Sequence, residues 1–263
     1  FGNNNMNIRP PIVAGQFYPE DPRELKETIQ EFLDQQPKDL FIPQKIRALV
    51  VPHAGYIYSG PVAAAAYQTL RLSRFEPQKI VLIGPSHHFP IADYITSSFD
   101  QWKTPLGKVP QIKVTQNEWT VFDLAFMPEH SLEVQLPFLQ TILSNFEIFP
   151  ILINNISLSE TLARKIKSLL DEKTLIIVSS DLSHYNPLAI TQKIDKQTQE
   201  IILQLKTTEA ENIDACGAAG ILTLMHLSKD LQWQRKLISY ATSYDNSNYK
   251  DEVVGYGSFL FYE

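Results

Sequence analysis

Histidines that could bind a metal ion or move a proton come directly after two predicted strands. His53 follows a strand predicted over Ile46–Val51, and His87 follows one predicted over Lys79–Ile83. A helix predicted over Pro61–Leu72 joins the strands in a βαβ unit, so both carboxyl ends reach one edge of the sheet. If the strands are neighbours, roughly 4.8 Å apart, both imidazoles could reach one ion. Taken singly, each histidine could instead be a hydrogen-bonded structural residue.

A third loop with acid–base groups follows the strand predicted over Thr174–Val178. It carries Asp181 and His184, which we expect at the same edge of the sheet. An imidazole with an ordinary pKa near ~6.5 suits general acid–base catalysis, and a nearby carboxylate would fix its tautomer. The alternative is that Asp181 only caps the following turn.

Two further groups flank the expected site. Glu129 and His130 precede a helix predicted over Ser131–Leu143, where they could act in catalysis or cap the helix. We assign His130 to the catalytic groups. We expect Glu129 to support the metal-binding residues through hydrogen bonds without touching the metal. His88 should point away from His87 and should also form a hydrogen bond behind the metal-binding residues.

Cys216 is the only cysteine of the chain and lies in a run of small residues, Ala215 to Gly220. A helix predicted over Gly217–Leu227 follows, and its first amides would lower the pKa of the thiol. The alternative is a buried apolar cysteine in a closely packed segment.

The elements that must position these residues alternate along the chain. Further helices are predicted over 22–33, 159–170 and 190–205, with strands over 148–153 and a final pair over 236–241 and 253–261. This order predicts an α/β fold, a three-layer α/β/α sandwich around a mostly parallel or mixed sheet.

Composition narrows the function. The chain has 263 residues, 44% of them hydrophobic and 20% charged, which suits a single domain spanning residues 1–263. A net charge of -6 argues against binding to nucleic acid, and the longest apolar runs are too short to span a membrane. One cysteine fits the reducing cytoplasm. We expect residues 1–5, which precede Met6, to be a cloning remnant.

Five ordered motifs together resemble the Memo-like family. They are Pro52-His53-Ala54-Gly55-Tyr56, Gly84-Pro85-Ser86-His87-His88, Glu129-His130-Ser131-Leu132-Glu133, Ser179-Ser180-Asp181 with His184, and Cys216-Gly217, and the opening Ala14-Gly15-Gln16-Phe17-Tyr18 is similar too.

The resemblance implies a fold akin to class III extradiol dioxygenases, with His53, His87 and Cys216 as metal ligands and His184 as the acid–base residue. A cysteine replaces the glutamate of those dioxygenases. This ligand set is softer than two histidines and a carboxylate, which weakens the argument for iron(II) and strengthens that for copper and zinc. We expect iron or copper, with zinc as the alternative. The family also includes peptide-binding signalling proteins and prokaryotic members associated with radical SAM proteins.

Two classes of function remain open. The first is a non-haem metal-dependent redox enzyme that acts on a small organic substrate. The second is a binding module for a peptide or small ligand, held by the aromatic residues Tyr18, Tyr56 and Tyr58. Metal-assisted hydrolysis, with His184 as the base, is a third hypothesis.

Overall fold

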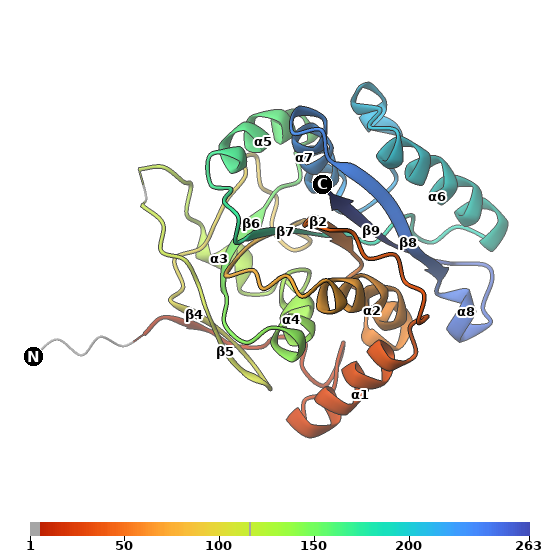
Figure 1. The fold of residues 1–263 in the computed structure, drawn as a ribbon, viewed down its shortest axis with the longest axis horizontal. Coiled ribbons are helices and arrows are strands. Elements are labelled where there is room, and N and C mark those ends of the chain that lie inside the picture. Colours follow the sequence, from red (N-terminus) through yellow and green to blue (C-terminus); the bar gives the residue numbers. More distant parts are fainter. Residues whose placement is uncertain (1–5, 116) are drawn as a thin grey trace, which may run out of the picture.

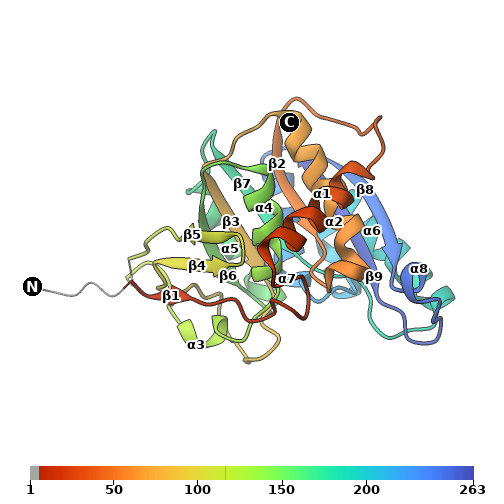
Figure 2. The same ribbon diagram turned by 90° about the horizontal axis from the view of Figure 1, so that it is seen from below.

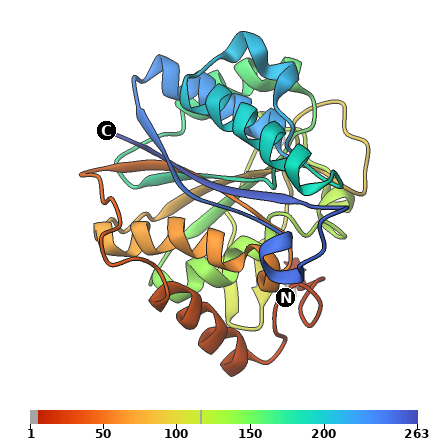
Figure 3. The ribbon, with the colours of Figure 1, turned by 90° about the vertical axis from the view of Figure 1, so that its right-hand side faces the viewer.

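The computed structural model describes residues 6–115 and 117–263, so the expectation for residues 1–5 lies outside the described residues. A mixed sheet runs through the middle of the molecule, and helices cover both of its faces (Figures 1 and 3). The expected three-layer α/β/α sandwich is confirmed.

The central sheet has the strand order β6-β3-β7-β2-β9-β8. Its strands are β2 (Ile46–Val51), β3 (Lys79–Gly84), β6 (Glu147–Leu152), β7 (Thr174–Ser179), β8 (Gln234–Thr242) and β9 (Gly255–Tyr262). The four strands from β6 to β2 are parallel, whereas β9 is antiparallel to β2 and to β8. The idea that β2 and β3 are neighbours is wrong, because β7 lies between them. Their axes are therefore about 10 Å apart, twice the spacing of adjacent strands.

Alternation of side chains along the strands divides the core between the two faces of the sheet. On β2, Leu49 and Val51 pack in one cluster, and Ala48 and Val50 pack in the other. The first face is covered by α1 (Pro22–Asp34), α2 (Tyr56–Ser73) and α4 (Leu136–Ile142), the second by α5 (Ser159–Lys167), α6 (Leu188–Leu203) and α7 (Ala218–Asp230). Each strand of the parallel region is thus buried on both sides over most of its length, which explains its largely apolar sequence.

Two helices begin five residues away from their predicted starts (61 to 56, and 131 to 136). Helix α2 starts at Tyr56, so Pro61 lies inside the helix and not at its first position. The helix predicted from Ser131 begins with a 3₁₀ turn at Glu133–Gln135 and becomes α-helical at Leu136, with Pro137 in its first turn. The residues before Glu133 therefore stay in a loop, where they are free to serve a site.

A smaller sheet of β1 (Ile8–Arg9), β4 (Gln101–Thr104) and β5 (Gly107–Pro110) lies beside β6, as Figure 2 shows, and was not predicted. Gln111 joins it to β6 through a bridge to Ile148. The other short elements are α3 (Asp123–Phe126), α8 (Tyr244–Ser247) and 3₁₀ turns at Ile156–Leu158 and Thr207–Asn212. Within residues 6–115 and 117–263, no helix has the length and apolarity needed to cross a bilayer.

Candidate metal centre

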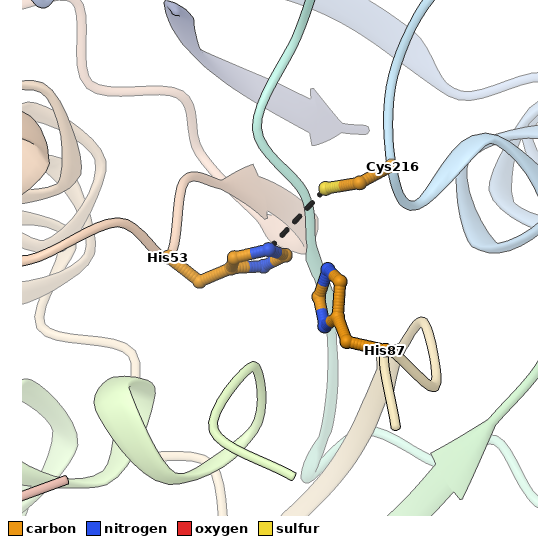
Figure 4. A group of neighbouring side chains, drawn as sticks. All are labelled: His53, His87 and Cys216. Atoms are coloured by element: carbon orange, nitrogen blue, oxygen red, sulfur yellow. Dashed lines mark hydrogen bonds between the residues drawn. The ribbon is translucent and has the colours of Figure 1, made fainter. Parts of the chain in front are cut away.

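His53, His87 and Cys216 converge beyond the carboxyl ends of the parallel strands, and Figure 4 shows their side chains turned toward a common point. One ligand atom from each lies within 4.8 Å of the other two. The Cys216 sulfur is 3.2 Å from His53 Nε2. Tetrahedral coordination by nitrogen at ~2.0 Å and sulfur at ~2.3 Å would separate these two atoms by about 3.5 Å. The three donor atoms therefore fit a metal ion if the distances from His87 to the other two shorten by less than about 1.5 Å.

Two glycines bring the ligand loops together by close backbone approach. A Cβ on Gly217 would lie 2.7 Å from Ser180 Cβ and 2.9 Å from the carbonyl oxygen of Ser179. A Cβ on Gly84, at the end of β3, would lie 2.7 Å from Leu132 and 2.9 Å from Ser131 Oγ. Small residues thus let the loops of Cys216 and His87 pack directly against their neighbours.

Glu129 orients His87. His87 Nδ1 lies 2.9 Å from Glu129 Oε1, and the His87 backbone N–H donates to Oε2 at 2.6 Å. The Ser131 N–H donates to Oε1 as well. Burial alone would raise the pKa of Glu129, but the hydrogen bonds from His87 and Ser131 outweigh it and lower this pKa to about 2. A charged carboxylate therefore accepts the Nδ1 proton and leaves His87 Nε2 free to bind.

Asp181 and Ser179 hold His53. The backbone N–H groups of His53 and Ala54 donate to Asp181 Oδ1 at 2.7 and 3.3 Å. The imidazole Nδ1 lies 3.0 Å from the Ser179 hydroxyl. His53 is 2% exposed, and burial and nearby His87 lower its pKa to about 3. His53 is therefore neutral at physiological pH, as a metal ligand must be.

The expectation that a helix N-terminus lowers the pKa of Cys216 is wrong. Burial raises the pKa of the thiol, nearby Asp181 raises it further, and the hydrogen bond from the Asp181 N–H at 3.3 Å only partly compensates. Helix α7 begins at Ala218, two residues beyond the cysteine. Without a cation the sulfur therefore stays protonated, and a metal ion would have to displace that proton.

The candidate centre forms part of the wall of a cleft of about 480 Å³. His130, Asp181 and His184 also line this cleft, so all three residues predicted to be catalytic lie around the same space as the candidate ligands. Pockets of 300–1,000 Å³ are typical of small-molecule sites. The volume of this cleft therefore falls within the range of sites that bind small molecules.

His130 lies beside both candidate imidazole ligands. Its ring stacks on His87 with centroids 4.7 Å apart and lies 5.5 Å from the ring of His53. Burial and His53 lower its pKa to about 4, so it is a neutral base at pH 7. Its Nδ1 is 3.6 Å from Glu129 Oε1, too far for a good hydrogen bond.

Two other expectations from the sequence differ from the arrangement of the described residues. His88 is exposed, and its ring centroid lies 6.2 Å from that of His130. Among the described residues its side chain has no hydrogen bond to a candidate ligand. Tyr18 and Tyr56 do not line the cleft, because they are buried and donate to Glu133 and to the Val134 carbonyl.

Sequence reasoning missed three aromatic residues of the cleft, Phe17, Tyr185 and Tyr256. Tyr185 is 72% exposed and has a positive φ of 59°, which is unusual for a bulky residue. Tyr256 could have been found from the predicted final strand. An antiparallel strand begins at the edge where its parallel neighbours end, and Tyr256 lies at the start of β9.

A solved structure shares this fold at low sequence similarity. The uncharacterized protein JW3007 from Escherichia coli K12 superposes with a TM-score of 0.50 at 12% identity, covering 82% of this chain and 99% of its own. At this identity the similarity shows the fold alone.

Sequence relatives are much more similar. A MEMO1 family protein of Pyrobaculum aerophilum is 37% identical, covering 98% of this chain and 100% of its own. Another from Sulfolobus acidocaldarius is 38% identical, covering 97% and 99%. Residues 9–260 match the family described as Memo-like protein. The chain belongs to the Memo-like family.

Proposed function

We propose that this protein is a metal-dependent redox enzyme that binds its metal through His53, His87 and Cys216 and acts on a small organic substrate. The observation that carries the proposal is the meeting of two imidazole nitrogens and one sulfur within 4.8 Å in the wall of an open cleft. Structural zinc sites are closed by four protein ligands, whereas three ligands leave a position open for substrate.

Iron or copper is the metal we propose, with zinc as the alternative. A site of two imidazoles and a thiolate is softer than the two-histidine, one-carboxylate set that is typical of non-haem iron(II) enzymes, so the ligands do not select iron alone. A bound redox metal would supply electron transfer to or from the substrate.

The neighbouring groups can bind substrate and move protons. His130 is neutral, with its pKa lowered to about 4 by burial, so it can accept a proton from a substrate hydroxyl. His184 faces the same cleft and is the second candidate for acid–base work. Phe17 and Tyr185 offer aromatic surface against which a planar organic substrate could stack.

Metal content tests the centre. Protein purified under anaerobic conditions should contain close to one equivalent of iron, copper or zinc. His53→Ala and Cys216→Ala should lose it while circular dichroism shows an intact fold, because loop residues at a sheet edge contribute little to the core. His226→Ala, on α7 and outside the cleft, is the matched control. Full occupancy in both folded cleft variants would refute the centre.

Oxygen consumption tests the redox reaction. Protein loaded with iron(II), copper or zinc is mixed with a panel of small phenols and other organic acids in an oxygen electrode. Turnover with iron or copper that is lost in His130→Gln and His184→Gln supports the proposal. Ester hydrolysis by the zinc form alone would instead identify a metal-assisted hydrolase.

A binding module is the second candidate, favoured by the exposed aromatic and aliphatic side chains beside the cleft. Ile57 is 69% exposed and Tyr58 40% exposed, and both follow Gly55, which lines the cleft. A peptide or small ligand that bound the metal-free protein and the His53→Ala variant equally well would favour this function. By family resemblance we also propose an association with a radical SAM protein, which co-purification from the native host would test. From the single cysteine we propose a cytoplasmic location, which fractionation of that host would test.

A further inference from the structure

We propose that Ser179 is a positioning residue that fixes the tautomer of His53, with the proton on Nδ1 and the lone pair of Nε2 directed at Cys216. The proposal deepens the metal site proposed above and rests on it for its functional meaning. The hydrogen bonds of four buried residues carry the argument: His53, Ser179, Gln135 and Tyr67 are each at most 2% exposed. Water therefore cannot replace any partner easily.

The amide of Gln135 can adopt only one orientation. Its Nε2 donates to the carbonyl oxygen of Pro52 at 3.0 Å and to Ser179 Oγ at 2.8 Å. Its Oε1 accepts from the Tyr67 hydroxyl at 2.6 Å. A flipped amide would place Oε1 against the Pro52 carbonyl, which can only accept. Gln135 is therefore a donor to Ser179.

The hydroxyl of Ser179 has one proton, and the Ser131 carbonyl takes it. The two oxygens are 2.6 Å apart, and a carbonyl cannot donate, so the Ser179 proton must point at Ser131. The remaining lone pairs of Ser179 Oγ face Gln135 Nε2 and His53 Nδ1, the latter at 3.0 Å. Ser179 can therefore only accept from His53.

A neutral imidazole has one donor nitrogen and one acceptor nitrogen. With Nδ1 as the donor to Ser179, Nε2 keeps its lone pair, and the Cys216 sulfur lies 3.2 Å from it. The opposite tautomer would donate Nε2–H to that sulfur, occupying both atoms that a metal needs. The network thus leaves Nε2 as an acceptor. In the metal-free protein the protonated thiol can donate to it, and a metal ion has to displace only that one proton.

Nuclear magnetic resonance of metal-free protein labelled with ¹⁵N-histidine tests the tautomer directly. Correlations between the ring nitrogens and ring carbon-bound protons distinguish Nδ1–H from Nε2–H, and the spectrum of His53→Gln assigns the signal. We expect Nδ1–H in the wild type and a loss of that preference in Ser179→Ala. Nε2–H in the wild type would overturn the proposal, and this result needs neither metal binding nor a folded Ser179→Ala variant.

Zinc affinity separates positioning from a merely structural role. Ser179→Ala removes the acceptor for His53 and should weaken zinc binding about 10- to 100-fold. Gln135→Met removes the two hydrogen bonds that Gln135 donates and leaves the Tyr67 hydroxyl without its acceptor. Ser179 can still donate to the Ser131 carbonyl and accept from His53. It should therefore destabilise the fold more than Ser179→Ala while weakening zinc binding less.

Ser228→Ala is the matched control, because Ser228 is equally buried and donates to a backbone carbonyl at the far end of α7. Its zinc affinity should equal that of the wild type. Zinc affinities that simply follow the stabilities of the three variants would overturn the proposal. Failure of the wild type to bind zinc would instead count against the proposed metal site, while the tautomer of His53 would still be read from the spectrum.

Discussion

At the scale of single residues, the two candidate imidazole ligands are held by different acceptors. His87 donates to the carboxylate of Glu129, whereas His53 faces the uncharged hydroxyl of Ser179. A carboxylate behind an imidazole raises its basicity as a ligand, and a hydroxyl does so less. His87 should therefore be the stronger of the two nitrogen donors.

Replacement of Glu129 tests this difference. Glu129→Gln removes the charge behind His87 and can present an N–H where an acceptor is needed, so zinc affinity should fall about 10- to 100-fold. Competition with a fluorescent chelator measures it. Glu160→Gln, on the exposed surface of α5, should change nothing. An unchanged affinity in Glu129→Gln would mean that His87 is not a ligand or needs no orienting partner.

Acid should destabilise the metal-free protein through its buried histidines. The pKa of His53 is lowered to about 3 and that of His130 to about 4, from 6.5, in both cases first by burial. As the pH falls, the two imidazoles therefore take up protons in the unfolded chain before they do so in the folded chain. The stabilisation that comes from keeping these imidazoles neutral is fully present above pH ~6.5. It is lost as the pH falls toward 4, by at most about 1.4 kcal/mol per pH unit for each histidine.

Urea unfolding of chelator-treated protein between pH 7.5 and 4 measures this slope. In His53→Gln the slope between pH 6.5 and 4 should be clearly smaller than in the wild type, since one of the two groups is gone. His88→Gln, which changes an exposed side chain, should keep the wild-type slope. Equal slopes in all three proteins would contradict the depressed pKa of His53.

At the scale of elements, the close approach of α7 to the end of β7 sets the position of Cys216. Gly217→Ala would place a Cβ 2.7 Å from Ser180 Cβ and 2.9 Å from the Ser179 carbonyl oxygen, where backbone must move. We expect a loss of about 1–3 kcal/mol in the free energy of unfolding. Zinc affinity should fall as well, because the sulfur moves with the loop.

Ala218→Gly is the control for that variant, because it alters the adjacent residue without adding an atom. It should cost no more than about 1 kcal/mol, as glycine does in a helix. Denaturant unfolding and zinc titration measure both variants. Wild-type stability and affinity in Gly217→Ala would show that the loop adapts and that the glycine does not position the cysteine.

The sequence predicted most long elements correctly because their apolar patterns are strong. Both faces of the parallel strands are buried, so β2 and β7 are largely apolar, with Ala48–Val51 and Leu175–Val178 as unbroken apolar runs. The strand order could not be read in the same way, since sequence does not say that β7 enters between β2 and β3. The strands β4 and β5 have four residues each and only one large buried apolar side chain apiece, Trp102 and Val109, which is too few to reveal a period in the sequence.

The candidate site was predicted in part for the same physical reason. His53 and His87 each follow a strand whose end reaches the sheet edge, so their convergence followed from topology. The hydrogen bonds that hold the two histidines in place could not be predicted from the sequence. Bonds such as that between Gln135 and Ser179 join residues 44 positions apart and leave no local sequence pattern. The raised pKa of Cys216 depends on burial, which a helix start alone does not reveal.

At the scale of the whole molecule, the candidate ligands tie together distant parts of the chain. His53 and Cys216 are separated by 163 positions. An unfolded chain cannot hold their three ligand atoms together, so an ion that binds them must favour the folded state.

Zinc should therefore raise the stability of the entire protein. At a free concentration of 1,000 times its Kd, the expected gain is about 4 kcal/mol in the free energy of unfolding. Thermal unfolding followed by circular dichroism, with and without zinc, measures it as an increase in Tm. His226→Ala should keep the gain and Cys216→Ala should lose it. An equal gain in both variants would mean that zinc binds elsewhere.

The place of β2 in the sheet also has a consequence for the growing polypeptide on the ribosome. Both strands that flank β2 come much later in the chain, β7 at Thr174–Ser179 and β9 at Gly255–Tyr262. At a synthesis rate of 5–20 residues per second, β2 waits about 10 to 40 s for its second neighbour. During that interval a largely apolar strand has open edges, to which chaperones bind and on which aggregates grow. Synthesis of this protein should therefore depend on chaperones more than its ordinary composition suggests.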